Sequence, residues 1–285
     1  MKRREFLLAL PGALLGGAVQ IREPQRITVL SYNIHHGEGT DGQVDLERIA
    51  ALIRGAAPDL VALQEVDRLT RRTGGVDQAQ RLACLTGMQH FFGRTIDYQG
   101  GMYGNAVLSR LPVNGFANRA LPFTPGREPR GVVHLHVYSG PTEAGGAIFR
   151  FFATHLDVNE ADRLKAVPAL LEFAAEEPEM PSLLAGDLNA LPESAPLKLL
   201  AEGWQVAGAG QWLPTYPAGA PARQIDYILY RPAHRWRVVE VKVLEEATAS
   251  DHRPILAALE LLPAEAPAEG RSRRSRQAVP APARS

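Results

Sequence analysis

The sequence predicts a sheet-rich α/β sandwich, and three observations support this fold class. Many short apolar runs of strand length are separated by only a few segments with helical periodicity. These strands do not alternate regularly with helices, as they would in a fold built of βαβ units. The 285 residues, 45% of them hydrophobic, suffice for one large domain, and no internal stretch has the composition of a linker between two domains.

The first half of the chain is predicted to hold four strands and two helices. A first strand with alternating apolar and polar residues is followed by a glycine-rich loop and a helix. The next strand is a near-continuous apolar run, which is typical of a strand buried on both faces. We expect strands over residues 26–32, 59–64, 106–109 and 131–138 and helices over 45–56 and 77–85.

The second half is predicted to hold one long helix and five strands. We expect strands over residues 148–155, 181–185, 225–230, 237–245 and 254–261 and the helix over 160–175. From residue 263 to 285 the composition turns to Ala, Pro, Glu, Arg and Ser, which cannot bury enough apolar surface to fold. We therefore predict a catalytic domain over residues 21–262 and a disordered tail over 263–285.

The N-terminus has the pattern of an export signal. Lys2, Arg3 and Arg4 precede a mildly apolar stretch that ends near Val19 and is broken by glycines, so it is too short to span a bilayer securely. The paired arginines resemble a twin-arginine signal, which carries folded proteins out of the cytoplasm. We expect residues 1–20 to direct the protein to the periplasm or the medium.

The charge of the folding part argues against a protein that holds long nucleic acid. The whole chain is neutral, but residues 21–262 hold 23 basic and 28 acidic residues, or about −5. Binding through many phosphate contacts usually requires an excess of Lys and Arg. The single cysteine, Cys84, excludes an intramolecular disulfide and a Cys-based metal site, and we expect it to be a small buried residue.

One glycine pattern is a false signal. Residues 37–42 match the dinucleotide-binding pattern letter for letter, between a predicted strand and a predicted helix. In that fold the glycines form the tight turn directly after the strand, whereas here His35 and His36 intervene. We interpret the segment as a flexible surface loop.

Polar residues at strand ends form the stronger signal. Strand ends that meet at one edge of a sheet sandwich gather such residues into a single pocket. Carboxylates and amides that converge without cysteine are the ligands that Mg²⁺ prefers. The residues in question are Asn33, Glu65, His155, Asp157, Asp187, Asn189, Asp251 and His252.

Seven motifs in order resemble the endonuclease/exonuclease/phosphatase superfamily of Mg²⁺-dependent metallophosphoesterases, which includes deoxyribonuclease, sphingomyelinase and inositol-polyphosphate phosphatase folds. They cover the chain from about Ile27 to Leu261. The motifs are Ser31-Tyr32-Asn33-Ile34, Gln64-Glu65-Val66, Gly104-Asn105-Ala106-Val107-Leu108-Ser109-Arg110, Thr154-His155-Leu156-Asp157, Gly186-Asp187-Leu188-Asn189-Ala190, Gln224-Ile225-Asp226-Tyr227-Ile228 and Ser250-Asp251-His252-Arg253-Pro254.

The resemblance implies a four-layer sandwich, with two mixed β-sheets packed face to face and helices on the outside. It also implies attack of water on a phosphodiester or phosphomonoester with help from Mg²⁺, for which Mn²⁺ is the alternative. Phosphate esters resist hydrolysis because their negative charge repels nucleophiles, so such a site must neutralise charge and position a water. Glu65 is the first choice as metal ligand, with Asn33 as a neutral oxygen ligand and Asp251 closing the site.

The remaining roles follow from the resemblance and from residue chemistry. Similar enzymes orient the histidine at position 252 with the aspartate at 226, and this pair serves as general base or as a cationic phosphate contact. Asp187 would orient or deprotonate the attacking water, Asn189 would donate to a phosphate oxygen, and His155 would stabilise charge on phosphate. Abasic-site endonucleases carry a tyrosine near the place of His155, which favours other branches.

Several further residues have weaker claims. Asn105 and Arg130 are candidates for phosphate contacts, but we expect both to be structural. His134 and His136 share a strand face and are expected to be a packed or solvated pair, not a second metal site. In the loop over residues 205–223, Trp212 and Tyr216 either stack on a substrate or pack the domain.

The leading hypothesis is thus an exported, monomeric phosphodiesterase or phosphatase acting on a small or lipid-derived phosphate ester. An extracellular nuclease is the alternative enzyme, which the charge disfavours. A binding protein on an inactive scaffold is a third hypothesis, but Glu65, Asp187, Asp226 and His252 are all present. A serine hydrolase lacks support because the chain has no Gly-x-Ser-x-Gly motif.

Overall fold

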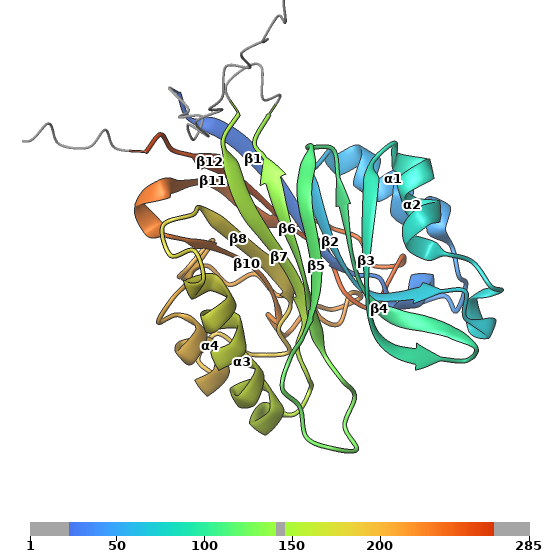
Figure 1. The fold of residues 1–285 in the computed structure, drawn as a ribbon. Helices are drawn as coiled ribbons and strands as arrows, with labels where there is room; N and C mark the ends of the chain where they lie inside the picture. The colour runs from blue at the N-terminus through green and yellow to red at the C-terminus, as the bar shows by residue number, and fades with distance from the viewer. Residues whose placement is uncertain (1–22, 141–145, 265–285) are drawn as a thin grey trace, which may run out of the picture.

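The computed structural model describes residues 23–140 and 146–264. The predicted export signal over residues 1–20 and residues 265–285 of the predicted tail lie outside this part of the chain. Two six-stranded sheets pack face to face, and pairs of helices cover their outer faces, as Figure 1 shows. This arrangement confirms the predicted four-layer sandwich with two mixed sheets inside and helices outside.

The first sheet has the strand order β11-β12-β1-β2-β4-β3. Strand β1 is parallel to β2 and antiparallel to β12, so the sheet is mixed. The strands are β1 (Gln25–Asn33), β2 (Leu60–Arg68), β3 (Gln89–Tyr98), β4 (Gly101–Ser109), β11 (Trp236–Val243) and β12 (Ile255–Leu261).

The second sheet has the order β5-β6-β7-β8-β10-β9. Strand β7 is parallel to β8, and β8 is antiparallel to β10. The strands are β5 (Val113–Ala120), β6 (Gly131–Tyr138), β7 (Ile148–His155), β8 (Ser182–Asp187), β9 (Gln205–Val206) and β10 (Asp226–Arg231).

Among residues 23–140 and 146–264, four α-helices form the outer layers, and side chains of their flanking residues fix where three of them begin. Asp45, Asp77 and Asn159 accept hydrogen bonds from the first backbone N–H groups of α1, α2 and α3, respectively. The predicted helices at these three places are confirmed. The helices are α1 (Leu46–Ala56), α2 (Gln78–Thr86), α3 (Glu160–Ala175) and α4 (Ala195–Leu200).

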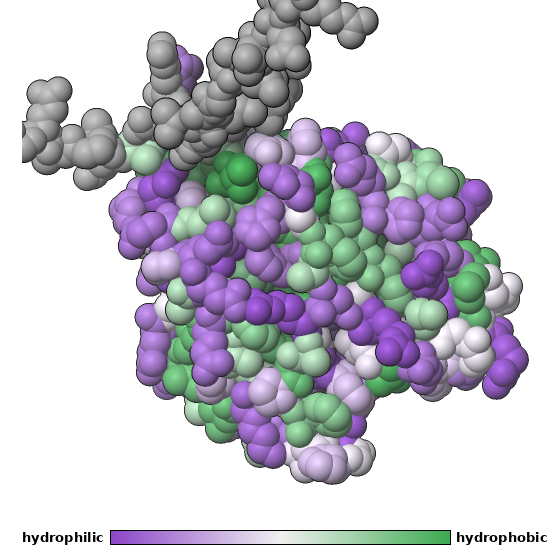
Figure 2. Space-filling model, in the orientation of Figure 1, coloured by the Kyte–Doolittle hydropathy of each residue, from purple (hydrophilic) through white to green (hydrophobic). Residues whose placement is uncertain are grey.

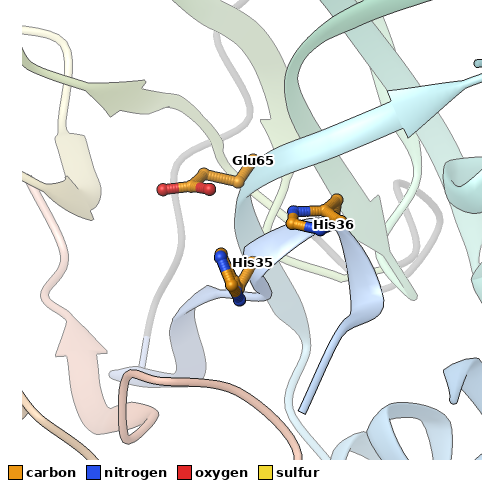
Figure 3. A group of neighbouring side chains, drawn as sticks. All are labelled: His35, His36 and Glu65. Carbon is orange, nitrogen blue, oxygen red and sulfur yellow. The ribbon is translucent and has the colours of Figure 1, made fainter. Parts of the chain in front are cut away.

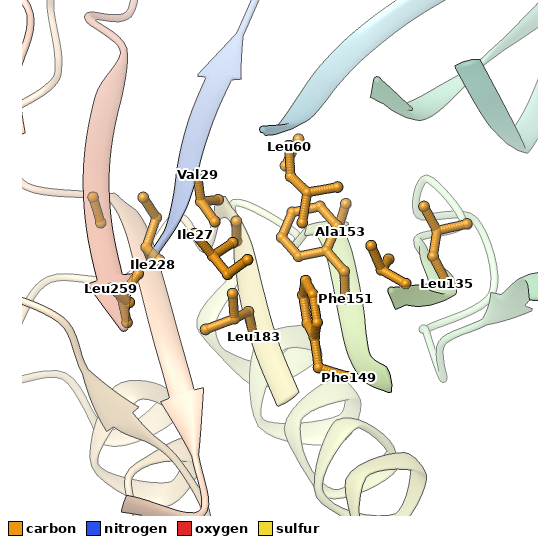
Figure 4. Close-up of a cluster of buried hydrophobic side chains, with 14 of the residues drawn as sticks. Ile27, Val29, Leu60, Leu135, Phe149, Phe151, Ala153, Leu183, Ile228 and Leu259 are labelled. Carbon is orange, nitrogen blue, oxygen red and sulfur yellow. The ribbon is translucent and has the colours of Figure 1, made fainter. Parts of the chain in front are cut away.

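Three apolar layers hold the sandwich together. The central layer lies between the sheets, where Val29 and Leu60 of the first sheet face Phe151 and Leu183 of the second (Figure 4). A second layer joins α1 and α2 to the first sheet, and a third joins α3 and α4 to the second. Each fully buried large aliphatic or aromatic side chain contributes roughly 1.5 to 3 kcal/mol relative to an exposed one.

The surface hydropathy, the length of the helices and the position of the single cysteine are described next. On the face shown in Figure 2, hydrophilic and hydrophobic side chains are interspersed. No helix among the described residues has the length and apolar character needed to cross a membrane. Cys84 is exposed on α2, so the expectation that it is buried was wrong; its position on the helix faces away from the sheet.

The loop with the glycine pattern is anchored to the last part of the domain. The backbone N–H of Thr40 donates to the carbonyl oxygen of Thr248 at 2.8 Å. A Cβ atom on Gly39 would stand 2.3 Å from the same carbonyl oxygen, so only glycine fits there. The helix that follows is capped by Asp45, and the glycines do not form a tight turn directly after β1.

Candidate active site

The strand-end residues meet where both sheets end on the same side. Asn33 is the last residue of β1, His155 is the last of β7, and Asp187 is the last of β8. Asp226 opens β10, which runs antiparallel to β8, so it lies directly opposite Asp187 in the register. His252 lies in the turn before β12.

Asn33 joins the two sheets at this edge. Its side-chain nitrogen donates to Oε1 of Glu65 at 3.0 Å and to Oδ2 of Asp187 at 3.2 Å. Glu65 belongs to the first sheet and Asp187 to the second, so one amide group contacts a carboxylate from each. The hydroxyl of Ser250 donates to the backbone carbonyl of Asn33 at 2.7 Å and fixes the end of β1.

The placement of Glu65 depends on a β-bulge. Leu63 pairs with Ala106 and Val66 with Gly104, so two residues of β2 stand opposite one residue of β4. Glu65 accordingly adopts a left-handed backbone conformation with φ of 58°, which costs about 1 to 3 kcal/mol in a residue other than glycine. The bulge redirects the carboxylate of Glu65 toward Asn33.

His252 is oriented by Asp226, as the resemblance implied. Nδ1 of His252 lies 2.9 Å from Oδ2 of Asp226, and the hydroxyl of Thr215 donates to the same oxygen. Burial alone would lower the pKa of His252, but attraction to Asp226, the hydrogen bond to it and the nearby Asp187 raise the pKa to about 10. The ring therefore carries positive charge at neutral pH, with Nε2 on the side of Asp187.

Asp187 lies at the centre of the cluster. Its Oδ2 stands 3.7 Å from Nε2 of His252 and 3.4 Å from Nε2 of His155, while its Oδ1 accepts from the backbone N–H of Asn189 at 2.8 Å. Burial and repulsion by Asp226 raise the pKa of Asp187 to about 7. The carboxylate is thus within reach of both histidines.

The ring of His155 is held between the side chains of Arg130 and Asn189. Nη1 of Arg130 lies 3.2 Å from Nδ1 of His155, and a guanidinium has only donors, so that ring nitrogen is unprotonated. Burial and the charges of Arg130 and His252 hold the pKa of His155 well below its usual range. The side-chain nitrogen of Asn189 lies 3.1 Å from Nε2 of the same ring and donates to the carbonyl of Leu156 at 3.0 Å.

Three expectations about weaker residues have different outcomes. Asn105 donates to the carbonyl of Gly131 across the two sheets, a structural contact, and its expected role stays a prediction. Arg130, also expected to be structural, contacts His155 and pairs with Glu128 at 2.8 Å, so it holds the histidine ring in place. His134 stacks on Phe152 with ring centroids 4.4 Å apart, and His136 contacts Glu177, so they form the packed pair that was expected.

The structure leaves some predicted residues at the margin and adds others. Asp251 is half-buried and contacts the hydroxyl of Ser250 at 3.3 Å, so its role as metal ligand stays a prediction. Asp157 pairs with Arg127. Sequence reasoning missed the role of Thr215. It left open whether Tyr216 stacks on a substrate or packs the domain; the ring centroid of Tyr216 lies 4.9 Å from that of His252.

The donor atoms at the centre fit a hard divalent cation. Asp187 and Asp226 offer carboxylate oxygens within 4.8 Å of each other, and Oδ1 of Asp226 is buried without a hydrogen-bond partner among the described residues, whereas the charged ring of His252 beside them has no free lone pair. Oδ1 of Asn33 accepts from the backbone N–H of His35 at 3.1 Å and keeps a second lone pair. With Glu65, the site supplies carboxylate and amide oxygens, the ligands that Mg²⁺ prefers.

Two facing sheets with a carboxylate and histidine cluster at one edge define a class of sandwich-fold phosphoesterases. The chain belongs to the Endonuclease/Exonuclease/phosphatase family, whose profile matches residues 30–252. Family members generally hydrolyse phosphate esters. The resemblance seen in the sequence is thereby confirmed.

Individual relatives support the same assignment. The chain is 29% identical over 246 residues to the uncharacterized protein YbhP of Escherichia coli, with 82% of this chain and 96% of YbhP covered. An endonuclease/exonuclease/phosphatase structure from Beutenbergia cavernae has a TM-score of 0.70 and 28% identity over 83% of this chain and 72% of that chain. The mannosyl-6-phosphatase Bt3783 of Bacteroides thetaiotaomicron shares the fold with a TM-score of 0.67 and 19% identity, covering 82% and 99% of the two chains.

Proposed function

We propose that this protein is a Mg²⁺-dependent hydrolase of phosphate esters, a phosphodiesterase or phosphatase that acts on a small or lipid-derived substrate. Mn²⁺ is the alternative ion. The observation that carries the proposal is the convergence of Glu65, Asn33 and Asp187 from both sheets beside the His252–Asp226 pair. One half of the cluster offers oxygen ligands, and the other offers groups that handle protons and phosphate charge.

The protein's own residues divide the work of hydrolysis. Glu65 and Asn33 would hold the cation, with Asp251 nearby; when bound, it would neutralise charge on the phosphate and polarise the ester. Asp187 is placed to orient the attacking water, because its carboxylate lies between His155 and His252.

The cationic His252 and two neutral side chains, His155 and Asn189, would bind the phosphoryl group. His252, held by Asp226 and Thr215, presents Nε2 toward the centre and would contact a phosphate oxygen or the leaving oxygen. His155 would contribute from the opposite side, with the positive charge of Arg130 behind it. Asn189 would donate to a non-bridging phosphate oxygen in place of its present contacts with His155 and the carbonyl of Leu156.

A substitution series tests the proposal with aryl phosphate esters, sphingomyelin, phosphoinositides, DNA and RNA as substrates. Glu65→Ala should lose activity that excess Mg²⁺ restores partly at best, and His252→Ala should lose it without losing Mg²⁺ affinity. Since both groups serve one transition state, the double variant should fall well short of the product of the two single losses. His90→Gln, an exposed position on β3, is the matched control.

Two results would overturn this function. Full activity in excess chelator would exclude the metal-dependent chemistry. A His252→Ala variant that turns over a good ester at the parent rate would reopen the hypothesis of a binding protein. Preference for DNA or RNA over all small esters would favour the extracellular nuclease, which the net charge of about −5 over residues 21–262 disfavours.

We also propose that the protein acts outside the cytoplasm. The support is the Arg3-Arg4 pair and the apolar stretch behind it. Replacing both arginines by lysine should retain the protein in the cytosol, as measured by fractionation of expressing cells. Unaltered delivery to the periplasm or medium would contradict the assignment of this segment as an export signal.

A further inference from the structure

A second group of potential metal ligands lies beside the proposed catalytic cluster. His35 and His36 follow β1, and Figure 3 shows them grouped with Glu65 at the bulge of β2. A ring nitrogen of each histidine and a carboxylate oxygen of Glu65 all lie within 4.8 Å of one another. Neither histidine has a role in the hydrolysis proposed above.

Glu38 orients both imidazole rings. Nδ1 of His35 lies 3.3 Å from the backbone carbonyl of Glu38; a carbonyl only accepts, so Nδ1 carries the proton and Nε2 keeps its lone pair. Nε2 of His36 lies 3.3 Å from the Glu38 carboxylate, which accepts from it. Metal-bound histidines commonly donate their second nitrogen to a carbonyl or a carboxylate in this way.

One atom of this group lacks a partner. His36 is only 8% exposed, and its Nδ1 is buried with no hydrogen-bond partner among the described residues. A buried imidazole nitrogen without a partner loses the hydrogen bond that it makes with water in the unfolded chain. A cation bound between the rings and Glu65 would satisfy this lone pair.

We propose that His35, His36 and Glu65 form a binding site for a first-row transition-metal dication, in the series from Mn²⁺ to Zn²⁺, next to the Mg²⁺ position. Imidazole nitrogen suits these ions, whereas Mg²⁺ prefers oxygen ligands. Ligand atoms about 2.0 to 2.2 Å from a shared ion stand about 3 to 3.6 Å apart, so small side-chain rotations from the present spacing would close the site.

Glu65 would be shared between the two positions. Its Oε1 accepts from Asn33, while the carboxylate also contributes to the histidine group. A transition metal at the histidine site would therefore stand directly beside the cation that is proposed to assist hydrolysis. Binding of this metal does not depend on the substrate or on turnover.

The direct test is the detection of nitrogen bound to Mn²⁺ by electron spin echo envelope modulation on the full-length protein. One equivalent of Mn²⁺ in excess Mg²⁺ should show ¹⁴N coupling from imidazole. The coupling should disappear in the His35→Gln/His36→Gln double variant and persist in His90→Gln. By titration, Mn²⁺ affinity should fall at least tenfold in the double variant, while Mg²⁺ affinity stays unchanged.

Variants that probe the ring orientation complete the test. Glu38→Gln should weaken Mn²⁺ binding by roughly tenfold, since loss of a partner behind a ligating histidine commonly costs 10- to 100-fold in affinity. If circular dichroism shows that the double variant does not fold, His35→Gln replaces it in the test of the metal site. His35 is half-exposed, so its substitution should leave the fold intact. That variant alone should reduce the ¹⁴N modulation depth and the affinity.

The inference is overturned if Mn²⁺ binds without ¹⁴N coupling. It is also overturned if the coupling survives in the double variant, which would assign the nitrogen to His155 or His252. Neither result bears on ester hydrolysis, because no substrate is present. Conversely, a protein without esterase activity that shows the expected coupling would retain the histidine site and lose the proposed function.

Discussion

His134 makes the stability of the domain sensitive to acid, and replacing it with phenylalanine should remove that sensitivity. The ring is 7% exposed and lies parallel to Phe152, with centroids 4.4 Å apart. Its Nε2 is buried without a hydrogen-bond partner among the described residues. Burial, followed by repulsion from His136 and Arg150, lowers the pKa of His134 to about 4 from an ordinary value near 6.5.

The sign and size of this pH dependence of the free energy of unfolding follow from the linkage between protonation and folding. Between pH 4 and 6.5 the unfolded chain binds a proton at this residue that the folded protein does not, so stability falls as the pH falls. With a native pKa of about 4, the loss reaches about 2 kcal/mol at pH 5 and about 3 kcal/mol at still lower pH. This is a large fraction of the 5 to 15 kcal/mol that typically stabilises a domain.

Urea unfolding of the parent and of His134→Phe at pH 8 and pH 5 measures this contribution. Any packing cost of the larger ring is present at both pH values and cancels in the comparison. The variant should gain about 2 kcal/mol relative to the parent on going from pH 8 to pH 5. The exposed control His90→Phe should follow the parent, and a gain below about 0.5 kcal/mol in His134→Phe would refute the reasoning.

Three further predictions concern the frame of the site. Gly186→Ala should destabilise the fold by about 3 kcal/mol or more in a denaturation experiment, because its Cβ would stand 2.0 Å from the backbone oxygen of Thr154; a well-folded, equally stable variant would contradict this. Thr215→Val, which removes the donor to Asp226, should lower kcat/KM by about tenfold, or about 1.4 kcal/mol, with the fold unchanged; parent kinetics would show that the hydroxyl does not position His252. Chelation should abolish turnover, and Mg²⁺ should restore it; activity that does not return would point to unfolding, which circular dichroism detects.

Two of the strands that support the site, β2 and β8, were predictable because each contains a continuous apolar run. Residues 59–64 and 181–185 are buried on both faces, so their sequences carry a clear signal. The edge strands β3 and β5 were missed for the opposite reason: half or more of their residues face solvent, and their sequences mix polar with apolar residues. Helix α4 has six residues, too few for a periodic pattern, and β9 has two.

The residues of the site were predictable as a set, but their mutual arrangement was not. Polar residues directly after apolar strands indicated Asn33, Asp187 and His155, and the motif order supplied Asp226 and His252. No sequence pattern indicates that the Asn33 amide contacts carboxylates of both sheets, since this depends on how the sheets align. Arg130 and Thr215 lie outside any strand and carry no periodic signal, so only the folded chain brings Arg130 to His155 and Thr215 to Asp226.

The hydrogen bonds of the Asn33 amide depend on how the two sheets are aligned. Because Asn33 and Glu65 belong to the first sheet and Asp187 to the second, a slide of one sheet along the other would change the hydrogen bond from Asn33 to Asp187 and leave the bond to Glu65 in place. That slide is resisted by the apolar side chains that interlock between the sheets, such as Phe151 and Leu183, and by hydrogen bonds across the sheets such as that of Asn105 to Gly131. A substitution that changes the shape of the apolar layer between the sheets, remote from any ligand, would therefore change the distance between the metal-binding half and the histidine half of the site. It would do so without replacing any functional side chain.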